Sequence, residues 1–390
     1  MGSSRQKPSV CFVAMNAYSV LSGRKDVNHT GGAEVQQLQM ASWLVRQGYS
    51  VSFVTLDHGQ PDGVDLGGIR VFKAYAKDAG IRGLRFIYPR WSGLWGAMAC
   101  ANADVYYQRT AECQTGQAAL WCRLHRRRFI FAAASDADCS ASLYGLTCRR
   151  EKTMYRLGLR LADGVTAQTV TQQRMLRKNM GISACVVRNC GSNPTVSSPP
   201  EARAATDANA NHVLWVGRIS NAKRLEWLLD VAQRCPDMMF DVVGAANTQC
   251  DYVSSLIARA ATISNVRMYG GVPYSDMPEY YRRCSVLCCT SAYEGFPNTF
   301  LEAWSLGIPV VSTFDPDGVI AGNGLGWVAQ NVDELVTCLN RVCQSPKLQM
   351  EASKAARQYY VAYHTPDACL PEFERLLLDI TGDGVGRQGQ

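Results

Sequence analysis

At 390 residues the chain is longer than one ordinary domain and fits two domains of roughly 150–200 residues each. Apolar residues make up 47% and charged residues 19%, which excludes a disordered chain and predicts well-filled cores. The net charge of +7 is unevenly divided: residues 1–195 hold 25 Lys and Arg against 12 Asp and Glu (+13), and the remainder holds 15 against 21 (−6). A basic half of this kind suits an anionic partner, for which nucleic acid and an acidic lipid surface both qualify.

The sixteen cysteines and the apolar runs bear on the compartment of the protein. Cysteines such as Cys11, Cys288 and Cys289 lie inside apolar runs, where a free thiol behaves as a small buried hydrophobe. We therefore expect a reducing compartment. No His/Cys cluster has the spacing of a zinc site, so we expect no metal. No apolar run reaches the about 20 residues of a membrane span, and Val10–Met15 predicts a first strand rather than a signal peptide. We therefore expect a cytoplasmic protein.

In chain order, the first half alternates short β-branched runs with helical patterns. We predict strands at Ser9–Met15, Ser50–Thr55, Asp104–Gln108, Arg128–Ala132 and Gly164–Gln168. Helices are predicted at Glu34–Arg46 and Arg149–Leu161. This alternation indicates a parallel sheet covered by helices.

A stretch rich in Ser, Pro, Ala and Asn, Ser192–Asn211, breaks the pattern, which then restarts. The second half is predicted to contain, in order, His212–Val216, Lys223–Arg234, Met239–Val243, Tyr252–Ala260, Val266–Tyr269, Ser285–Cys289, Thr299–Leu306 and Pro309–Ser312. We therefore predict an N-terminal domain (1–195), a linker (196–211), a C-terminal domain (212–365) and a C-terminal helix and tail (366–390). The last helix, about Asp367–Leu378, is expected to pack back across the domains.

The most informative motif is the segment Glu294–Glu302, which follows a predicted strand and opens a predicted helix. Pro297 suits the start of that helix. The free amides of Asn298, Thr299 and Phe300 would then face a ligand above the strand ends, where a phosphate is favoured. Glu302 can accept hydrogen bonds from ribose hydroxyls, and Glu294 can reach a sugar hydroxyl. The alternative is a helix whose acidic first turn only stabilises its dipole.

Two further motifs also follow predicted strands or loops. Gly217 permits a tight turn, and Arg218 and Lys223 beyond it can neutralise a diphosphate leaving group. The alternative, that Lys223 and Arg224 are solvated first-turn residues, is weakened because cations at a helix N-terminus oppose its dipole. The paired glycines Gly31 and Gly32 open a helix and allow close backbone approach, as would a plain turn with an N-cap.

Together these motifs resemble the retaining glycosyltransferases of family 4, which have the GT-B fold. The similarity runs from about Val10 to about Cys343 and includes Ala167-Gln168 with the helix Thr171–Arg177, and Val187–Gly191. It implies an α/β protein of two doubly wound Rossmann-like domains facing each other across a cleft. Residues 1–195 would bind the acceptor, and residues 212–365 would bind the nucleotide-sugar donor.

The resemblance also implies a role for each motif residue. Arg218 and Lys223 would bind the donor diphosphate, Glu302 the ribose and Glu294 the transferred sugar. Gly31 and Gly32 would close over the phosphate from the other domain. The remaining donor-binding residues would be Gly217, Gly295, Phe296, Pro297, Asn298 and Thr299.

In this family the transfer retains the anomeric configuration and uses no metal and no cofactor, because the two cations and the helix amides replace a metal. The expected activity is that of a hexosyltransferase. It would move a sugar from a UDP- or GDP-sugar to a glycan or polyprenyl-linked acceptor in bacterial exopolysaccharide synthesis. The base is not readable from Tyr274, Asp276 and Met277, which would line its pocket.

One departure from the family pattern concerns the acceptor side. Many members carry a His at the end of an N-domain strand, where this chain reads Phe131–Asp138 with no His. Ser135 or Asp136 would substitute by hydrogen-bonding the sugar or the acceptor hydroxyl, and we count Asp136 as a candidate catalytic residue. The alternative role for Asp136 is helix capping.

The positive charge of the first half has two open interpretations. The segment Arg149–Leu161 alternates cations with large apolar residues, as would an interfacial helix on anionic lipid or an ordinary helix with a solvated basic face. Arg126–Arg128 and Arg174–Lys178 add to this charge. Since no recognition module is visible, we expect no nucleic-acid partner and retain peripheral contact with the inner face of the cell membrane.

Two other function classes compete with a transferase. A nucleotide-sugar epimerase of the same fold would turn over donor without acceptor, but it needs extra carboxylates and His near the sugar, and none of the five His lies in the motifs. A non-catalytic scaffold would keep the fold, but the intact set of Arg218, Lys223, Glu294 and Glu302 argues against it.

Overall fold

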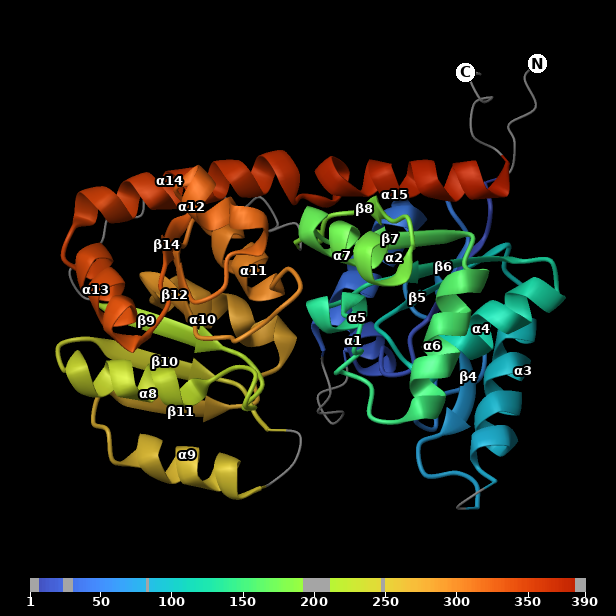
Figure 1. Ribbon diagram of the computed structural model, residues 1–390, viewed down its shortest axis with the longest axis horizontal. Coiled ribbons are helices and arrows are strands. Elements are labelled where there is room, and N and C mark those ends of the chain that lie inside the picture. Colours follow the sequence, from blue (N-terminus) through green and yellow to red (C-terminus); the bar gives the residue numbers. More distant parts are fainter. Residues whose placement is uncertain (1–6, 24–30, 82–83, 192–210, 247–249, 383–390) are drawn as a thin grey trace. The chain divides into compact units, whose positions relative to one another are not determined.

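The structure is a computed structural model that describes residues 7–23, 31–81, 84–191, 211–246 and 250–382. The chain divides into two compact units (Figure 1). Unit 1 comprises Met1–Cys190 together with Cys369–Gln390, and unit 2 comprises Gly191–Ala368. The predicted linker, 196–211, lies outside the described residues except for Asn211.

Unit 1 is built on an eight-stranded sheet with the strand order β3-β4-β2-β1-β5-β6-β7-β8. The strands are β1 (Val10–Val13), β2 (Val51–Asp57), β3 (Val64–Asp65), β4 (Ile69–Ala76), β5 (Val105–Arg109), β6 (Arg128–Ala132), β7 (Gly164–Ala167) and β8 (Cys185–Val186). All pair in parallel except β3, which runs antiparallel to β4. The strand order reverses between β1 and β5, as in a doubly wound sheet.

Helices cover both faces of the unit 1 sheet. They are α1 (Tyr18–Ser22), α2 (Gly32–Arg46), the π-helix η1 (Phe86–Trp91), α3 (Ser92–Ala101), α4 (Cys113–Leu124), α5 (Asp136–Cys139), α6 (Arg149–Leu161), α7 (Val170–Met180) and α15 (Pro366–Thr381). Along β1, Cys11 and Val13 pack in one core with α3, α4 and α6, whereas Val10 and Phe12 pack in the other with α2 and α15. This alternation is what a strand buried on both faces requires.

Unit 2 contains a six-stranded, fully parallel sheet with the order β11-β10-β9-β12-β13-β14. The strands are β9 (His212–Val216), β10 (Met239–Val243), β11 (Val266–Gly270), β12 (Val286–Cys289), β13 (Val310–Ser312) and β14 (Gly326–Val328). Here the strand order reverses between β9 and β12. Ligands of such sheets bind beyond the carboxyl ends of the strands at this reversal, which therefore marks where a site is expected.

The unit 2 sheet is also covered on both faces. Its helices are α8 (Leu225–Arg234), α9 (Asp251–Ala261), η3 (Tyr274–Asp276), α10 (Met277–Arg283), α11 (Asn298–Ser305), η4 (Pro316–Gly318), α12 (Val319–Asn323), α13 (Val332–Cys343) and α14 (Pro346–Tyr363). Trp215 of β9 is buried in the core that includes α8 and α13, and its neighbour Leu214 is buried in the core that includes α11.

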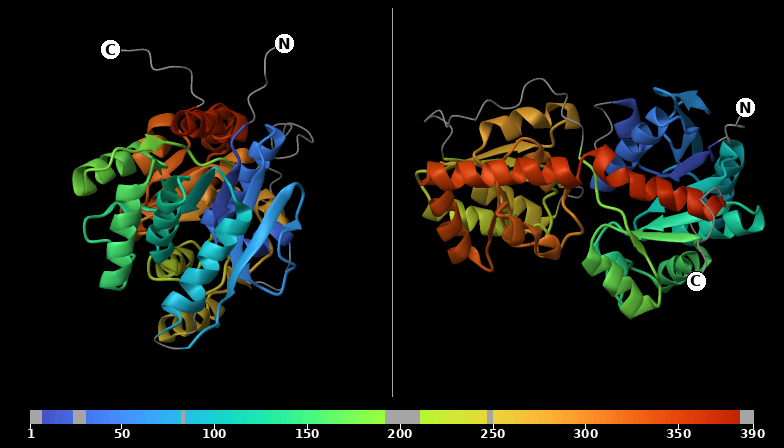
Figure 2. Two further views of the ribbon diagram at one scale, coloured as in Figure 1. Left: turned by 90° about the vertical axis from the view of Figure 1, so that its right-hand side faces the viewer. Right: turned by 90° about the horizontal axis from the view of Figure 1, so that it is seen from above.

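The C-terminal helix α15 packs on unit 1, along one face of its sheet (Figure 2). Leu370, Phe373 and Leu377 are buried in the same core as β1, and the Phe373 ring lies 5.4 Å from that of Tyr107. The chain thus leaves unit 1 after Cys190 and returns to it at Cys369.

The predicted fold class is confirmed, since both units are doubly wound α/β structures. Three predicted helix starts that bear on the site differ from the structure. The helix α2 begins at Gly32 rather than Glu34, and α11 begins at Asn298 rather than Thr299. The helix expected at Lys223–Arg234 begins at Leu225, because Arg224 has a left-handed backbone (φ 47°) that a helix cannot contain. Within the described ranges, no helix combines the length and apolarity needed to cross a bilayer.

Candidate functional site

The residues predicted to bind a donor diphosphate lie at the strand-order reversal of unit 2. The loop after β9 carries Gly217, Arg218 and Lys223, and the loop after β12 carries Glu294. Because β9 and β12 pair in parallel, their carboxyl ends lie side by side. The two loops are joined by a backbone hydrogen bond of 2.8 Å from the amide of Ala292 to the carbonyl oxygen of Ala222.

Lys223 and Glu294 form an ion pair across these loops. The Ser291 hydroxyl donates to the same carboxylate oxygen of Glu294 at 2.6 Å. Burial lowers the pKa of Lys223, but the charge and hydrogen bond of Glu294 together with the neighbouring Cys289 raise it by more, so that the pKa lies above its ordinary value. The raised pKa keeps the lysine charged, and its side chain, which is 28% exposed, can be reached by a ligand.

Arg218 is exposed in the same loop as Lys223. Its guanidinium acts on Lys223 in the opposite sense to Glu294 and opposes the rise of the lysine pKa. The structure therefore brings two cations together on one loop. Such a pair favours an anion that can share both charges.

Arg224 was predicted, as an alternative, to be a solvated residue of a first helical turn. In the structure its side chain instead connects the loops of the site. Its Nε donates to the carbonyl oxygen of Thr290 at 2.8 Å, and its Nη2 donates to the carbonyl oxygen of Ser291 at 2.9 Å and to the Thr313 hydroxyl at 3.0 Å. The guanidinium carbon also lies 3.9 Å from the ring centroid of Trp227. Arg224 therefore ties the loop after β9 to the ends of β12 and β13.

The turn between Gly295 and Thr299 leads into α11. Pro297 lies just before the helix, as its N-cap residue, and Asn298 and Thr299 form the first turn. The expectation for Phe300 is wrong, because its amide donates to the carbonyl oxygen of Pro297 at 3.1 Å and so serves the turn itself. Phe296 is buried, with its ring 4.8 Å from that of His364.

Glu302 lies one turn into α11. The Tyr281 hydroxyl donates to Oε2 of Glu302 at 2.6 Å, and Tyr274 contributes a second side-chain hydrogen bond. Burial nevertheless raises the pKa of Glu302 to about 7, although both hydrogen bonds act to lower it. A carboxyl group with such a pKa changes charge within the physiological range.

Gly217 has no positive φ, so its backbone does not require glycine. The residue that must be glycine in this turn region is Gly244. Gly244, after β10, has φ +150°, and a Cβ there would lie 1.8 Å from the carbonyl oxygen of Gly217. Only glycine fits at position 244. Gly244 was not predicted as a site residue, although a Gly directly after a predicted strand was a signal for it.

The remaining predicted residues belong to unit 1. Gly31 is the N-cap of α2 and Gly32 is its first residue. Asp136 is the first residue of α5, and its Oδ1 accepts a hydrogen bond of 3.1 Å from Gln172. Capping, the alternative role for Asp136, is performed by Ser135 together with Asp138.

Polar residues that the sequence analysis missed lie at the carboxyl end of β5. Arg109 is buried, and its Nη2 donates to Asn189 at 2.7 Å. Burial raises the pKa of Glu112 to about 7, with Glu34 and Asp138 acting in the same direction. The polar run directly after the predicted strand Asp104–Gln108 was the signal that could have found them.

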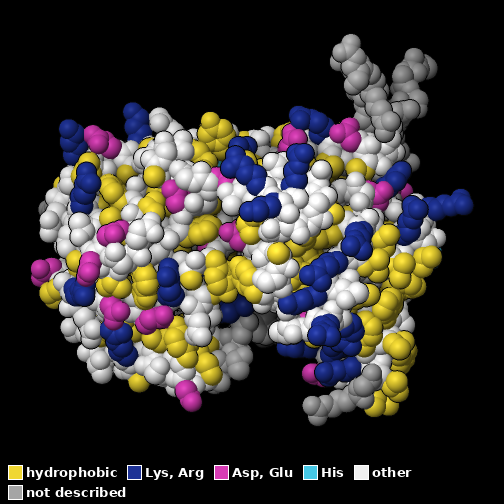
Figure 3. Space-filling view, viewed as in Figure 1, with side chains coloured by type: hydrophobic (Ala, Val, Ile, Leu, Met, Phe, Trp, Pro, Cys, Tyr) yellow, Lys and Arg dark blue, Asp and Glu magenta, His cyan; other side chains and the backbone are white. Residues whose placement is uncertain are grey.

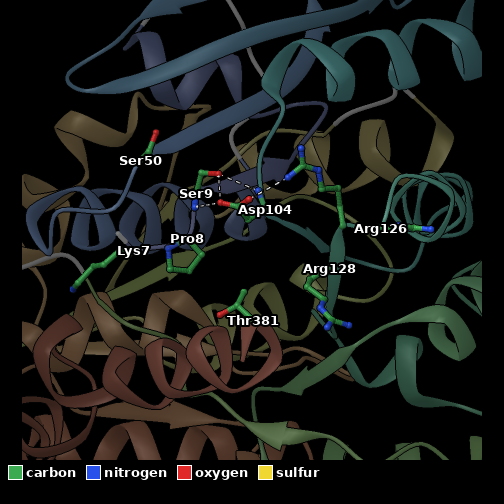
Figure 4. A pocket seen from close by; sticks show the side chains of 9 residues that line it. Lys7, Pro8, Ser9, Ser50, Asp104, Arg126, Arg128 and Thr381 are labelled. Carbon is green, nitrogen blue, oxygen red and sulfur yellow. Dashed lines mark hydrogen bonds and ion pairs between the residues drawn. The ribbon is translucent and has the colours of Figure 1, made fainter. Parts of the chain in front are cut away.

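A separate cavity of about 490 Å³ lies at the opposite, amino-terminal edge of the unit 1 sheet (Figure 4). It is lined by Lys7, Pro8, Ser9, Ser50, Asp104, Arg126, Arg127, Arg128 and Thr381. Arg127 pairs with Asp104 at 3.1 Å, Arg128 with Asp163 at 2.7 Å, and Lys7 with Glu374 at 3.0 Å. None of the predicted site residues lines this cavity.

The described residues contain no group of three or more His, Cys, Asp and Glu side chains placed to hold a metal ion. The arrangement in unit 2 offers cations, a helix N-terminus and two carboxylates instead. It can bind an anion next to hydroxyl-rich groups.

The two units correspond to two known domain families. Residues 31–191 match the Glycosyl transferase 4-like domain, and residues 200–359 match the Glycosyl transferases group 1 family. Both matches are to glycosyltransferase domain families, and together they cover most of residues 31–359.

Curated relatives are also glycosyltransferases by name. An uncharacterized glycosyltransferase of Haemophilus influenzae is 27% identical over 155 residues, which are 37% of this chain and 43% of the relative. The lipopolysaccharide 1,6-galactosyltransferase of Salmonella typhimurium is 32% identical over 188 residues, or 44% of this chain and 50% of the relative. The chain thus spans about half the length of the curated relatives it matches.

Solved structures share the fold over nearly the whole chain. Sucrose-phosphate synthase from Thermosynechococcus elongatus has a TM-score of 0.77 at 17% identity, covering 97% of this chain and 100% of that one. Anabaena HepE, solved in complex with UDP-glucose, has a TM-score of 0.73 at 17% identity, covering 96% and 100%. At this identity the likeness establishes the fold, which is GT-B.

Proposed function

We propose that this protein is a retaining glycosyltransferase that moves a hexose from a UDP- or GDP-sugar to a hydroxyl of a glycan or lipid-linked glycan acceptor. The observation that carries the proposal is the meeting of Lys223, Arg218 and Glu294 at the strand-order reversal of unit 2, beside the α11 N-terminus. The names of the relatives support a role in bacterial exopolysaccharide or cell-surface glycan synthesis, since they include amylovoran and lipopolysaccharide enzymes.

The cations of unit 2 suit the diphosphate of the donor. Lys223 and Arg218 would neutralise its charge, and the first-turn amides of α11 would bind a phosphate oxygen. As the bond from the sugar C1 to the diphosphate breaks, negative charge grows on the leaving oxygen, where both cations stabilise it. We therefore propose that transfer requires neither a divalent metal nor a cofactor.

The two carboxylates would select the rest of the donor. Glu302 accepts hydrogen bonds from the ribose hydroxyls, and Glu294, already oriented by Ser291, accepts from a hydroxyl of the transferred sugar. The bond to the acceptor oxygen forms on the face that the diphosphate leaves, and the departing phosphate oxygen takes the acceptor proton. Asp136 of unit 1 is proposed to hydrogen-bond the sugar or the acceptor hydroxyl.

We place this reaction in the cytoplasm, at the inner face of the membrane that carries the acceptor lipid. The charge of the first half of the sequence supports a place at this membrane, because residues 1–195 carry 25 Lys and Arg against 12 Asp and Glu.

The proposal is tested by a thermal-shift screen of UDP- and GDP-sugars, followed by transfer assays with the stabilising donor. We expect one nucleotide class to raise the melting temperature of the wild-type chain, and Glu302→Ala and Lys223→Ala to lose most of that rise. The anomeric configuration of the product, read by proton NMR, should equal that of the donor. An inverted product, or equal shifts in wild type and both variants, contradicts the proposal.

A further inference from the structure

An apolar patch on unit 1 belongs to neither the donor site nor the core. Ile81, Leu84, Ile87 and Tyr88 are 74%, 62%, 65% and 73% exposed and lie within eight positions of one another. The π-helix η1, which carries two of them, buries none of its own residues. Large apolar side chains scattered singly are normal on a protein surface, but four in one short segment mark an interaction site.

The inner side of this segment is anchored to the rest of unit 1. The Trp91 ring lies 5.4 Å from that of Phe86 and 5.7 Å from that of Trp95 in α3. Gly93, two residues on, packs so closely that a Cβ there would lie 2.6 Å from the carbonyl oxygen of Ala74. The segment is therefore held against β4 and α3 while its apolar side chains face solvent.

One cation of α6, Arg150, contacts this apolar segment. The guanidinium carbon of Arg150 is 4.2 Å from the centroid of the Phe86 ring, which joins α6 to η1. Figure 3 shows Lys and Arg side chains gathered beside exposed apolar surface on this face of unit 1. Within the described part of the chain, none of the exposed arginines of α6 (Arg149, Arg150, Arg156 and Arg160) is paired with a carboxylate.

The acidic side chain of α6 forms no ion pair with these arginines. Glu151 is occupied at the start of the helix, where its carboxylate accepts hydrogen bonds from Thr147 and from the amide of Cys148. Arg149, Arg156 and Arg160 recur at helical spacing and share one face of α6. Arg150, next to Arg149 in the first turn, links this face to the apolar segment through its contact with Phe86.

We propose that this surface, defined by Ile81, Leu84, Ile87 and Tyr88 together with Arg149, Arg150 and Arg156, docks unit 1 on an anionic phospholipid membrane. The apolar side chains enter the boundary between headgroups and acyl chains, and the arginines contact lipid phosphates. A symmetric contact with a second copy would place arginines against arginines. An anionic bilayer instead offers acyl chains to the apolar side chains and phosphates to the arginines. The inference rests on the proposed membrane location but not on the donor chemistry.

The test is co-sedimentation of the full chain with vesicles of phosphatidylcholine alone or mixed equally with phosphatidylglycerol, at low and high salt. The apolar variant is Leu84→Ser/Ile87→Ser/Tyr88→Ser, and the charge variant is Arg149→Gln/Arg150→Gln/Arg156→Gln. Matched controls on unit 2 are Ile257→Ser/Met350→Ser/Tyr363→Ser and Arg267→Gln/Arg282→Gln/Arg341→Gln, which change exposed residues of the same kinds.

We expect wild type and both controls to bind the anionic vesicles. The apolar variant should bind about tenfold or more weakly at either salt concentration, and the charge variant should lose its salt dependence as well as its affinity. A thermal shift with the donor that persists in both variants shows that they fold and that the donor site is intact.

Three outcomes overturn the inference. Wild type fails to bind anionic vesicles, or the apolar variant binds them as wild type does. In the third, analytical ultracentrifugation shows a wild-type dimer that the apolar variant abolishes, which assigns the surface to a second copy of the chain. If no nucleotide-sugar raises the melting temperature of the wild type, the proposed function is contradicted. The membrane inference is then still decided by vesicle binding alone.

Discussion

Lys223 donates a hydrogen bond to Glu294, 71 residues further along the chain, and so joins the loops that follow the two central strands of unit 2. The pair holds a cation and a carboxylate side by side at the point where a doubly wound sheet offers its ligand site. In the proposed reaction the cation would bind the donor diphosphate, and the carboxylate would bind a sugar hydroxyl.

Lys223→Ala should lower kcat/KM for transfer by about 10²–10³, because it removes one charge that stabilises the leaving diphosphate. Steady-state kinetics against donor concentration measure this effect. Lys347→Ala, which removes an exposed lysine of α14, is the matched control and should leave kcat/KM unchanged. A loss in the control equal to that in Lys223→Ala contradicts the assignment.

Arg224 should act as a positioning residue whose variants separate backbone strain from lost hydrogen bonds. Both Arg224→Gly and Arg224→Ala lose the bonds to Thr290, Ser291 and Thr313 and should raise the KM for donor more than they lower kcat. Because the backbone at position 224 is left-handed, the alanine variant should be less stable than the glycine variant by about 1 kcal/mol.

Urea unfolding compares the stability of the two Arg224 variants, and kinetics supply the split between KM and kcat. Equal stability of the glycine and alanine variants argues against the left-handed conformation. A wild-type KM in both variants contradicts the positioning role of Arg224.

Gly244→Ala should lower the free energy of unfolding by about 3 kcal/mol or more, since the new Cβ would lie 1.8 Å from the carbonyl oxygen of Gly217 at a backbone φ of +150°. Chemical denaturation measures the change. Gly322→Ala in α12 is the control: nothing lies within 4 Å of a Cβ there, and the helix should gain about 0.5–1 kcal/mol. Similar destabilisation of both variants contradicts the close approach.

The pH dependence of donor binding should report on Glu302. Because burial raises its pKa to about 7, the carboxyl is largely protonated at pH 6 and largely ionised at pH 8. Protonation turns one carboxyl oxygen into a donor and removes the charge, so the ionised form is the better acceptor and donor affinity should rise with pH through about 7. Titration of the wild type and of Glu302→Gln measures this, and an equally steep pH profile in Glu302→Gln contradicts it.

Protein stability should change with pH in the opposite direction. The pKa of Glu302 in the folded chain lies above its ordinary value of 4.5, so the folded state holds the proton more tightly than the unfolded state does. The stabilisation is complete below about pH 4.5 and is lost as the pH rises through about 7. Thermal melts across this range should therefore show a shallower fall in Glu302→Gln than in wild type.

Much of the fold follows from local sequence pattern. The strands Arg128–Ala132, His212–Val216 and Met239–Val243 match their predicted bounds, because each is a short apolar run in a sheet buried on both faces. The strand β4, Ile69–Ala76, was not predicted, since Arg70 and Lys73 interrupt its apolar pattern. The short β14 depends on Gly326, which approaches Val310 so closely that no Cβ fits, and such a contact is invisible in sequence.

The candidate site, like the fold, could be predicted from the sequence only in part. Motif spacing predicted Lys223 and Glu294, because residues directly after parallel strands meet at one edge of the sheet. It could not predict the positioning role of Arg224, which depends on a left-handed backbone and on acceptors 66 to 89 residues away. The pKa of Glu302 was equally out of reach, since it follows from burial rather than from sequence neighbours.

The most direct measurement of the central claim is calorimetric titration of the wild-type chain with UDP and with GDP, in the presence of a chelator and again with magnesium. We expect one of the two nucleotides to bind with the same affinity in both conditions, and this binding to be lost in Lys223→Ala. Binding that appears only when magnesium is added, or that survives unchanged in Lys223→Ala, contradicts the claim that side-chain cations and helix amides alone hold the diphosphate.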